Sequence, residues 1–157
     1  MSIVDENYIK KSIMEAEGYR DTIYICTENH RTIGWGHKCV EDHWRDNTAY
    51  PQGYLREVFD IDFAQAKSQM KELLAQEDLD IKSDAQNILI EMIFQMGKNG
   101  VSKFRNMMKA LRGHNYALAS SEMLDSLWAK QTPSRAKKLS DLMKYVAESI
   151  IKKNMGL

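Results

Sequence analysis

The sequence predicts an α+β fold with a small β-hairpin lobe near the N-terminus and a larger all-helical lobe after it. Two stretches, T-I-Y-I-C and R-T-I-G-W-G, are rich in β-branched and aromatic residues and flank the turn-rich tetrad T-E-N-H, which indicates a hairpin. From about residue 61 onward, apolar residues recur at helical spacing. The chain has 157 residues, of which 43% are hydrophobic and only 2 are proline, and this suits one folded, mostly helical domain with one or two lobes.

The N-terminal segment predicts a helix followed by the hairpin. The helix is expected over about 5–17, where apolar residues share one face: Tyr8, Ile9, Ile13 and Ala16. Gly18 follows in the position of a C-terminal cap. Within the hairpin, Gly34 and Gly36 indicate that the backbone approaches a neighbour closely.

The rest of the chain predicts a linking helix and a helical lobe. Residues 38–60 are expected to be irregular, and a helix over about 61–77 is polar on most sides, which is typical of a bridge between lobes. The strongly apolar segment 85–96 belongs in the core of the larger lobe. Further helical patterns cover about 102–112, 115–128 and 134–154, with a favourable start at Thr132 and Pro133.

These elements define one domain, 1–157, with three parts. We expect the small lobe over about 18–62 and the linking helix over about 61–77. The helical lobe is expected over about 78–157, together with the N-terminal helix.

The formal net charge of zero conceals two halves of opposite sign. Residues 1–95 contain 10 Lys+Arg and 18 Asp+Glu, a balance of −8, whereas residues 96–157 contain 12 and 4, a balance of +8. The split is consistent with two solvated faces that differ in charge, and also with a basic half that meets a polyanion such as nucleic acid or an anionic cell surface. Charge alone does not choose between these interpretations.

The composition of the chain also indicates in which cellular compartment the protein is expected. No apolar run approaches the roughly 20 residues that span a bilayer, and the first residues carry acids and lack an apolar signal core. With only 2 cysteines, a disulfide framework is not expected. We therefore expect a protein that is made and held in a cytosol.

Three groups of residues could carry chemistry. Glu17 lies at the expected C-terminal end of its helix, where the helix dipole disfavours a carboxylate anion and favours a general acid, although an ordinary exposed Glu is the simpler interpretation. Cys26 fits a small packed apolar residue, or a nucleophile or base that pairs with His37 in a Cys–His hydrolase. The spacing of His37, Cys39 and His43 matches no strong zinc pattern, so no metal site is expected.

Three motifs in order resemble one known family. The run E-G-Y-R-D-T-I-Y-I-C-T-E-N-H-R-T-I-G-W-G-H, over 17–37, is similar to the active-site segment of the T4-type phage lysozymes, the endolysins of glycoside hydrolase family 24. F-Q-M-G-K-N-G-V-S-K-F-R-N, over 94–106, and W-A-K-Q-T-P-S-R-A-K, over 128–137, resemble the same family. The resemblance spans almost the whole chain and implies a lysozyme-like fold.

The resemblance implies a muramidase, without a cofactor, that cuts the β-1,4 bond between N-acetylmuramic acid and N-acetylglucosamine in bacterial peptidoglycan and lyses a host cell. It places Glu17 on the proton donor and Thr32 on a threonine that holds the attacking water. Cys26 falls where most members carry Asp and some carry Cys. His37 matches a structural histidine with an acidic partner, for which Glu72 is the nearest candidate.

The resemblance also implies where substrate is bound. Arg135 falls on the arginine that faces the catalytic Glu, and Gln95 lines the cleft. By position, the further sugar contacts are Lys38, Phe94, Met107 and Glu122. The partner is then peptidoglycan rather than nucleic acid, with no stable membrane insertion and with a monomer as the expected state. The expected location is the host cytoplasm, until release to the periplasm or cell wall.

The cysteine leaves two mechanisms and three function classes open. In an inverting glycosidase the two groups stand roughly 6.5–9.5 Å apart with water between them. A free thiol has a pKa of about 8.5, so Cys26 could act as a thiolate, or as a neutral thiol that only places the water with Thr32. Besides a muramidase, the sequence is compatible with a wall-binding or phage structural module that lost the chemistry, and with a Cys–His peptidoglycan amidase.

Overall fold

A computed structural model describes residues 3–157 and confirms an α+β, lysozyme-like fold with a small antiparallel sheet near the N-terminus. The chain divides into two compact units. Lys10–Gln65 forms one, which we call the sheet unit. The described residues up to Ile9 form the other with Ala66–Leu157, and we call it the helical unit. The helices α1 (Glu6–Glu17) and α2 (Gln52–Gln76) each contribute residues to both units.

The ends of α1 follow from local capping. The side chain of Asp5 accepts a hydrogen bond from the backbone N–H of Tyr8 at 2.8 Å, which satisfies one of the unpaired donors of the first turn. At the other end Gly18 adopts a φ of 71°, and its N–H donates to the carbonyl of Met14 at 3.0 Å. The predicted C-terminal cap at Gly18 is confirmed.

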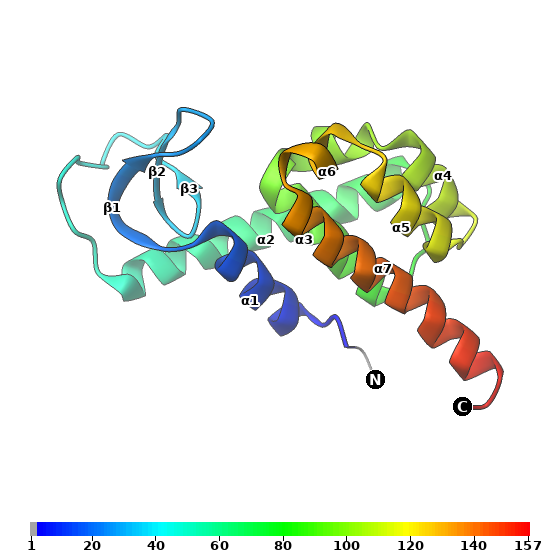
Figure 1. Ribbon diagram of the computed structural model, residues 1–157. Helices are drawn as coiled ribbons and strands as arrows, with labels where there is room; N and C mark the ends of the chain where they lie inside the picture. The colour runs from blue at the N-terminus through cyan, green and yellow to red at the C-terminus, as the bar shows by residue number, and fades with distance from the viewer. Residues whose placement is uncertain (1–2) are drawn as a thin grey trace. The chain divides into compact units, whose positions relative to one another are not determined.

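The predicted hairpin is part of a three-stranded sheet. The strands β1 (Arg20–Ile25), β2 (Arg31–Gly34) and β3 (His37–Lys38) follow one another in the order β1-β2-β3, and both pairs are antiparallel (Figure 1). The short strand β3 was not predicted. It forms because Gly34 and Gly36 both have positive φ values, 62° and 81°, which turn the chain back on itself within two residues.

The core of the sheet unit lies on one face of this sheet. Ile33, Trp44 and Leu55 are buried there, with Trp35 and Cys39 among the partly buried residues packed against them. This cluster joins the sheet to the loop after it and to the first turns of α2.

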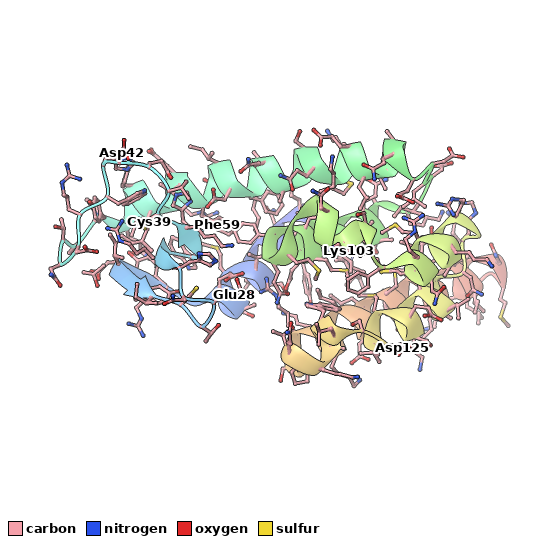
Figure 2. The ribbon with its side chains drawn as sticks, turned by 90° about the horizontal axis from the view of Figure 1, so that it is seen from above. Glu28, Cys39, Asp42, Phe59, Lys103 and Asp125 are labelled. Atoms are coloured by element: carbon pink, nitrogen blue, oxygen red, sulfur yellow. The ribbon has the colours of Figure 1, made fainter. Side chains whose placement is uncertain are left out.

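The helix α2 begins at Gln52, directly after Pro51, rather than near residue 61. The expectation of an irregular segment over 38–60 is therefore wrong for its last part. Leu55, Phe59 and Phe63 follow one another four residues apart and are all at most 2% exposed, so they form one buried stripe along the helix. Phe59 is labelled on this helix in Figure 2.

The helical unit is built around α3 (Ser83–Ser102). It also contains α4 (Arg105–Arg112), α5 (Tyr116–Leu124), α6 (Leu127–Gln131) and α7 (Pro133–Asn154). The long helix α7 lies alongside α5 and also contacts α3 and α6 (Figure 1). Fully buried side chains from several helices form the core, among them Ile88, Leu89, Met92, Met108, Leu111, Leu139 and Met143.

Two features of these helices refine the prediction. The segment expected as one helix over 115–128 is two helices, because Ser126 takes an extended conformation and its side chain caps α6 by accepting from the N–H of Ala129. The predicted start of the last helix is confirmed, since Pro133 occupies its first turn after Thr132. Across the described residues no helix is long and apolar enough to span a bilayer.

Candidate active site

The carboxylate of Glu17 lies against the backbone of Gly36 in the sheet unit. A Cβ atom added to Gly36 would stand 2.7 Å from Oε2 of Glu17 and 2.9 Å from its carboxyl carbon, closer than non-bonded atoms approach. A side chain at position 36 would therefore displace the carboxyl group of Glu17 from this position. Gly36, the second glycine of I-G-W-G-H, therefore matters in two ways. It leaves room for the carboxyl group of Glu17, and its φ of 81° allows the chain to turn into β3.

One face of the sheet gathers the other predicted residues of this unit. Thr32 stands directly opposite Tyr24 on β1 and opposite Lys38 on β3. Side chains of directly opposed residues lie on the same face of a sheet, so these three form a row across it. The next residue, Ile33, points to the other face and into the core cluster. The register thus places Lys38 beside Thr32.

Cys26 continues this face at the end of β1, beside the hairpin turn that carries Glu28 (Figure 2). Hydrogen bonds lower the pKa of the Cys26 thiol, the largest contribution coming from the backbone of His30 and the next from the side chain of Thr32. The hydroxyl of Thr32 also lies 2.9 Å from the carbonyl oxygen of His30, to which it can donate. Because a hydroxyl has one proton, Thr32 can donate a hydrogen bond to the carbonyl oxygen or to the sulfur, but not to both at once. If Cys26 is a thiolate, the hydrogen bond to the sulfur is the stronger one.

Tyr24 interacts electrostatically with both the acid and the thiol. Burial raises the pKa of its hydroxyl, and the negative charges of Glu17 and Cys26 raise it further. The guanidinium of Arg20 lies over the ring, 4.8 Å from its centroid. Glu17, Tyr24, Cys26 and Thr32 therefore share one electrostatic neighbourhood in the sheet unit.

His37 has two acidic partners, and neither is the expected Glu72. Its Nδ1 lies 2.8 Å from Asp62 on α2, and its Nε2 lies 2.6 Å from Glu41 in the loop after β3. Glu72 instead pairs with Lys98 at 3.1 Å in the helical unit. Burial acts to lower the pKa of His37, but the hydrogen bonds to Asp62 and Glu41 outweigh it and raise that pKa.

The same register separates His37 from Cys26. His37 is opposed to Ile33, so it lies on the core side of the sheet rather than on the face of Thr32 and Cys26. A Cys–His pair of the hydrolase type is therefore not formed by these two residues. His43, the third member of the candidate metal pattern, lies 3.0 Å from the hydroxyl of Tyr54. Within residues 3–157 no group of three metal-ligating side chains is found.

Cys26 and Cys39 are both free thiols. The backbone N–H of Cys39 donates to the carbonyl of Arg31 on β2, whereas that of Cys26 donates to His30 from the opposite side of the same strand. Two strands separated by a third are about 9–10 Å apart, and a disulfide needs Cα atoms within about 7 Å. The strand β2 therefore keeps the two thiols apart.

In the helical unit, Arg135 and Gln95 belong to adjacent polar contacts. Nε of Arg135, in the first turn of α7, donates to Oε2 of Glu91 on α3 at 2.9 Å. One helical turn further along α3, Gln95 accepts a hydrogen bond from Trp128 Nε1 at 2.8 Å and lies 3.4 Å from the hydroxyl of Thr132. Phe94, half-buried, precedes Gln95 on the same helix.

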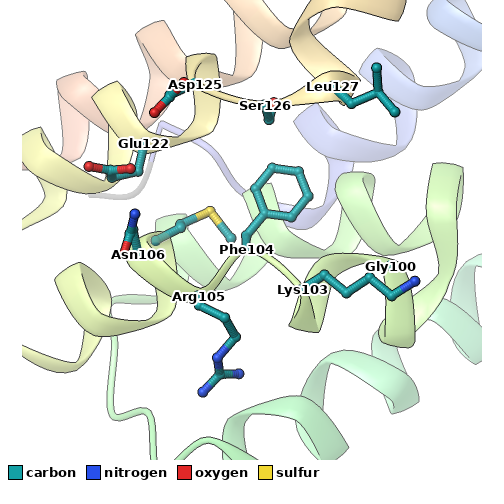
Figure 3. Close-up of a pocket in the computed structure, with 10 residues that line it drawn as sticks. Gly100, Lys103, Phe104, Arg105, Asn106, Glu122, Asp125, Ser126 and Leu127 are labelled. Carbon is teal, nitrogen blue, oxygen red and sulfur yellow. The ribbon is translucent and has the colours of Figure 1, made fainter.

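Met107 and Glu122 line one pocket of the helical unit, with a volume of about 490 Å³. The carboxylates of Glu122 and Asp125 stand on one side, the side chains of Lys103 and Arg105 on the other, and the ring of Phe104 between them (Figure 3). Arg105 is paired with Glu77 at 2.9 Å. The pocket thus offers an apolar floor with charged walls of both signs.

Several residues of these arrangements were not expected from the sequence. Glu91 could have been noticed in the sequence, since it is the one charged residue within the largely apolar run N-I-L-I-E-M-I-F, and a buried charge needs a partner. Asp62 lies in a polar stretch with several other acids, and Glu41 in a loop without periodicity, so neither stood out. The contact of Gly36 with Glu17 joins two segments whose approach no spacing rule describes.

Fold and site together define a protein of the lysozyme-like class, with an acid held at a helix end against a small antiparallel sheet. The phage lysozyme family model matches residues 14–145, and the chain belongs to this family.

The chain is similar to three proteins with different names and lengths. The chain is 32% identical over 145 residues to the pre-baseplate central spike protein Gp5 of Enterobacteria phage T4, covering 79% of this chain and 25% of that protein. It is 27% identical over 153 residues to probable T4-type lysozyme 1 of Dictyostelium discoideum, covering 83% and 90%. It is 27% identical over 128 residues to peptidoglycan hydrolase gp36 of Pseudomonas phage phiKMV, covering 81% and 14%. The chain thus spans only a small part of the two larger phage proteins.

Proposed function

We propose that this protein is a muramidase that hydrolyses the β-1,4 bond between N-acetylmuramic acid and N-acetylglucosamine in bacterial peptidoglycan. Membership of the phage lysozyme family and the likeness to a protein named peptidoglycan hydrolase support this class of substrate. The observation that carries the proposal is the arrangement in the sheet unit, where Glu17 is seated against Gly36 and shares its surroundings with Cys26 and Thr32.

Each residue then has a role in the reaction. Glu17 donates its proton to the leaving glycosidic oxygen. Cys26 and Thr32 hold the water molecule that attacks the sugar: as a thiolate Cys26 would take a proton from this water, and as a neutral thiol it would only place the water. Lys38, on the same sheet face, supplies a donor for sugar oxygens.

The helical unit supplies the remaining substrate contacts in this proposal. Arg135, Gln95 and Phe94 are grouped at the start of α7 and on α3, and they bind the glycan. Met107 and Glu122 contribute through the pocket between α4 and α5. We further propose that the protein acts as a monomer, and that it lyses a host cell after release from the host cytoplasm to the wall.

Glu17→Gln tests the proposal. This variant keeps the shape of the side chain but cannot donate the proton, so it should bind peptidoglycan and lose nearly all turnover. The measurement is clearing of exposed Gram-negative peptidoglycan, with mass analysis of the products. Glu15→Gln, an exposed acid on the same helix, is the matched control and should cut normally.

The outcomes separate the alternatives. The muramidase is supported if the wild type frees glycan ends and Glu17→Gln does so at less than a tenth of that rate, which corresponds to an activation barrier higher by more than about 1.4 kcal/mol. Retention of more than a tenth of the rate overturns the role of Glu17. Freed peptides would indicate an amidase.

A second candidate is a structural module that binds the wall without cutting it. The 32% identity to part of a phage spike protein favours this candidate, as does the replacement of the usual Asp by Cys26. It predicts binding to peptidoglycan with no cleavage by the wild type.

A further inference from the structure

Glu91 is a fully buried acid on the apolar face of a core helix. Its neighbours on α3, Ile90, Met92 and Ile93, are at most 2% exposed, and Glu91 itself is 0% exposed. A carboxylate in such surroundings is strongly unfavourable unless a partner compensates it. Leucine or methionine would fill this position without that penalty, which suggests that the carboxylate of Glu91 has a role other than packing.

Arg135 is a partner of Glu91. The Nε–H of Arg135 donates to Oε2 of Glu91 at 2.9 Å, and the side chain of Arg135 is only 11% exposed. One helical turn further along α3, Gln95 donates a hydrogen bond to the hydroxyl of Thr132, the residue just before α7. This contact also connects α3 to the start of α7. The guanidinium is therefore held at a defined place at the start of α7.

We propose that Glu91 is a positioning residue that acts through Arg135, holding the guanidinium in one orientation for substrate. The inference rests on the proposed function, in which Arg135 contacts the glycan. An arginine side chain has many rotamers, and fixing one before binding removes an ordering penalty from association. Because the carboxylate also compensates the charge, Arg135 serves as a pre-oriented hydrogen-bond donor suited to neutral hydroxyl and amide oxygens of a sugar.

A purely structural ion pair gives a different expectation. Removal of Glu91 would then lower stability and leave the substrate affinity of the folded protein unchanged. If Glu91 acts through Arg135, its removal raises KM, leaves kcat nearly unchanged, and has no further effect once Arg135 is gone. The separation of KM from kcat and the coupling to Arg135 therefore distinguish the two roles.

The experiment compares Glu91→Met, Arg135→Ala and the double variant in a double-mutant cycle. We expect Glu91→Met to raise KM about tenfold, the size typical of a lost hydrogen bond to a charged group, with kcat within about threefold of wild type. On the Arg135→Ala background it should change KM less than about twofold. Asp141→Asn, which removes the exposed partner of Lys137 on the same helix, is the matched control and should leave KM unchanged.

Two further variants keep the test decisive. Glu91→Gln retains an oxygen that can accept from Arg135 and should restore most of the affinity. If Glu91→Met does not fold, Glu91→Asp replaces it, since its carboxylate is one methylene shorter and should raise KM about threefold or more. An unchanged KM in the folded variant, or an equal rise on both backgrounds, overturns the inference.

Binding without turnover separates this inference from the proposed function. Sedimentation with purified peptidoglycan, carried out on the Glu17→Gln background, measures the coupling between Glu91 and Arg135 when no bond is cut. If the wild type cuts no glycan but this coupling persists, the muramidase proposal fails and the positioning role stands. If the wild type cuts glycan and the coupling is absent, only the positioning role fails.

Discussion

The two units hold their candidate site residues in different ways. In the sheet unit, the backbone positions these side chains, because Gly36 leaves room for the carboxyl group of Glu17 and the backbone of His30 is hydrogen-bonded to the sulfur of Cys26. In the helical unit, one side chain fixes another, since the carboxylate of Glu91 accepts a hydrogen bond from Arg135. The sheet unit should therefore be sensitive to changes of backbone shape, whereas the helical unit should respond to loss of a single polar partner.

Apart from Glu17→Gln, the largest combined effect on rate and stability is expected from Gly36→Ala. Its Cβ would stand 2.7 Å from Oε2 of Glu17, so the acid must move. A displacement of this kind can cost on the order of 100-fold in rate, and the positive φ adds about 1–3 kcal/mol of strain. Turnover and thermal unfolding measure the two effects separately.

Gly18→Ala is the control for this prediction. Gly18 has a similar φ of 71°, but nothing lies within 4 Å of its added Cβ. This variant should be destabilised and yet keep much more activity than Gly36→Ala. Equal activity in the two variants would mean that the seat of Glu17 does not matter to the reaction.

Next in size are substitutions of Cys26. Cys26→Ala should lose about 100-fold in rate, because the water loses its polar partner, whereas Cys26→Asp should stay active. Cys26→Ser separates the two thiol mechanisms, since a hydroxyl can hold water but is not ionised near pH 7. A nearly active Ser variant favours a neutral thiol that places the water.

The pH dependence of the wild type provides the second half of this test. If Cys26 acts as a thiolate, the rate should rise as the thiol ionises, and the lowered pKa places this rise at a lower pH than for an ordinary cysteine. A Cys26→Ala enzyme with full glycan-cutting activity would falsify any role for Cys26 beyond packing.

A smaller effect, on stability rather than chemistry, is expected from Asp62→Asn. The pKa of His37 is raised in the folded protein, so protonated His37 stabilises the fold. This contribution is fully present below the unfolded pKa of about 6.5 and is lost as the pH rises through the folded pKa. Asp62→Asn should lower the free energy of unfolding by about 1–3 kcal/mol near pH 6.

Melting temperatures across pH 5–10 would check this expectation, since the difference between Asp62→Asn and wild type should shrink towards alkaline pH. Glu72→Gln removes an exposed partner of Lys98 and serves as the control. It should shift the melting temperature little at any pH, because exposed pairs contribute about 0–1 kcal/mol. A constant difference across the pH range would contradict the role of His37.

The smallest effect concerns the two thiols. Burial raises the pKa of Cys39, and hydrogen bonds lower that of Cys26, so iodoacetamide near pH 7 should label Cys26 first. Air exposure should leave both thiols titratable, because β2 separates them. Mass spectrometry of digests would report both results, and a Cys26–Cys39 bridge formed without loss of activity would remove Cys26 from the mechanism.

Much of this architecture could be predicted from sequence patterns. The α1 cap at Gly18, the pairing of β1 with β2, the core helix α3 and the Pro133 start of α7 each follow from a local rule. The start of α2 and the break at Ser126 could not be placed, because the stripe of Leu55, Phe59 and Phe63 is diluted by polar residues and one serine cap interrupts a continuous pattern.

The sequence by itself determined the class of fold and indicated which residues are candidates for the reactive groups, because periodicity, caps and motif spacing are local properties of the chain. Only the tertiary structure decided which groups meet. It placed Asp62 and Glu41 on His37, Glu91 on Arg135, and Gly36 against Glu17. These partners are separated by 4 to 44 residues in the numbering, and their contacts depend on how strands and helices pack, which side-chain chemistry alone does not specify.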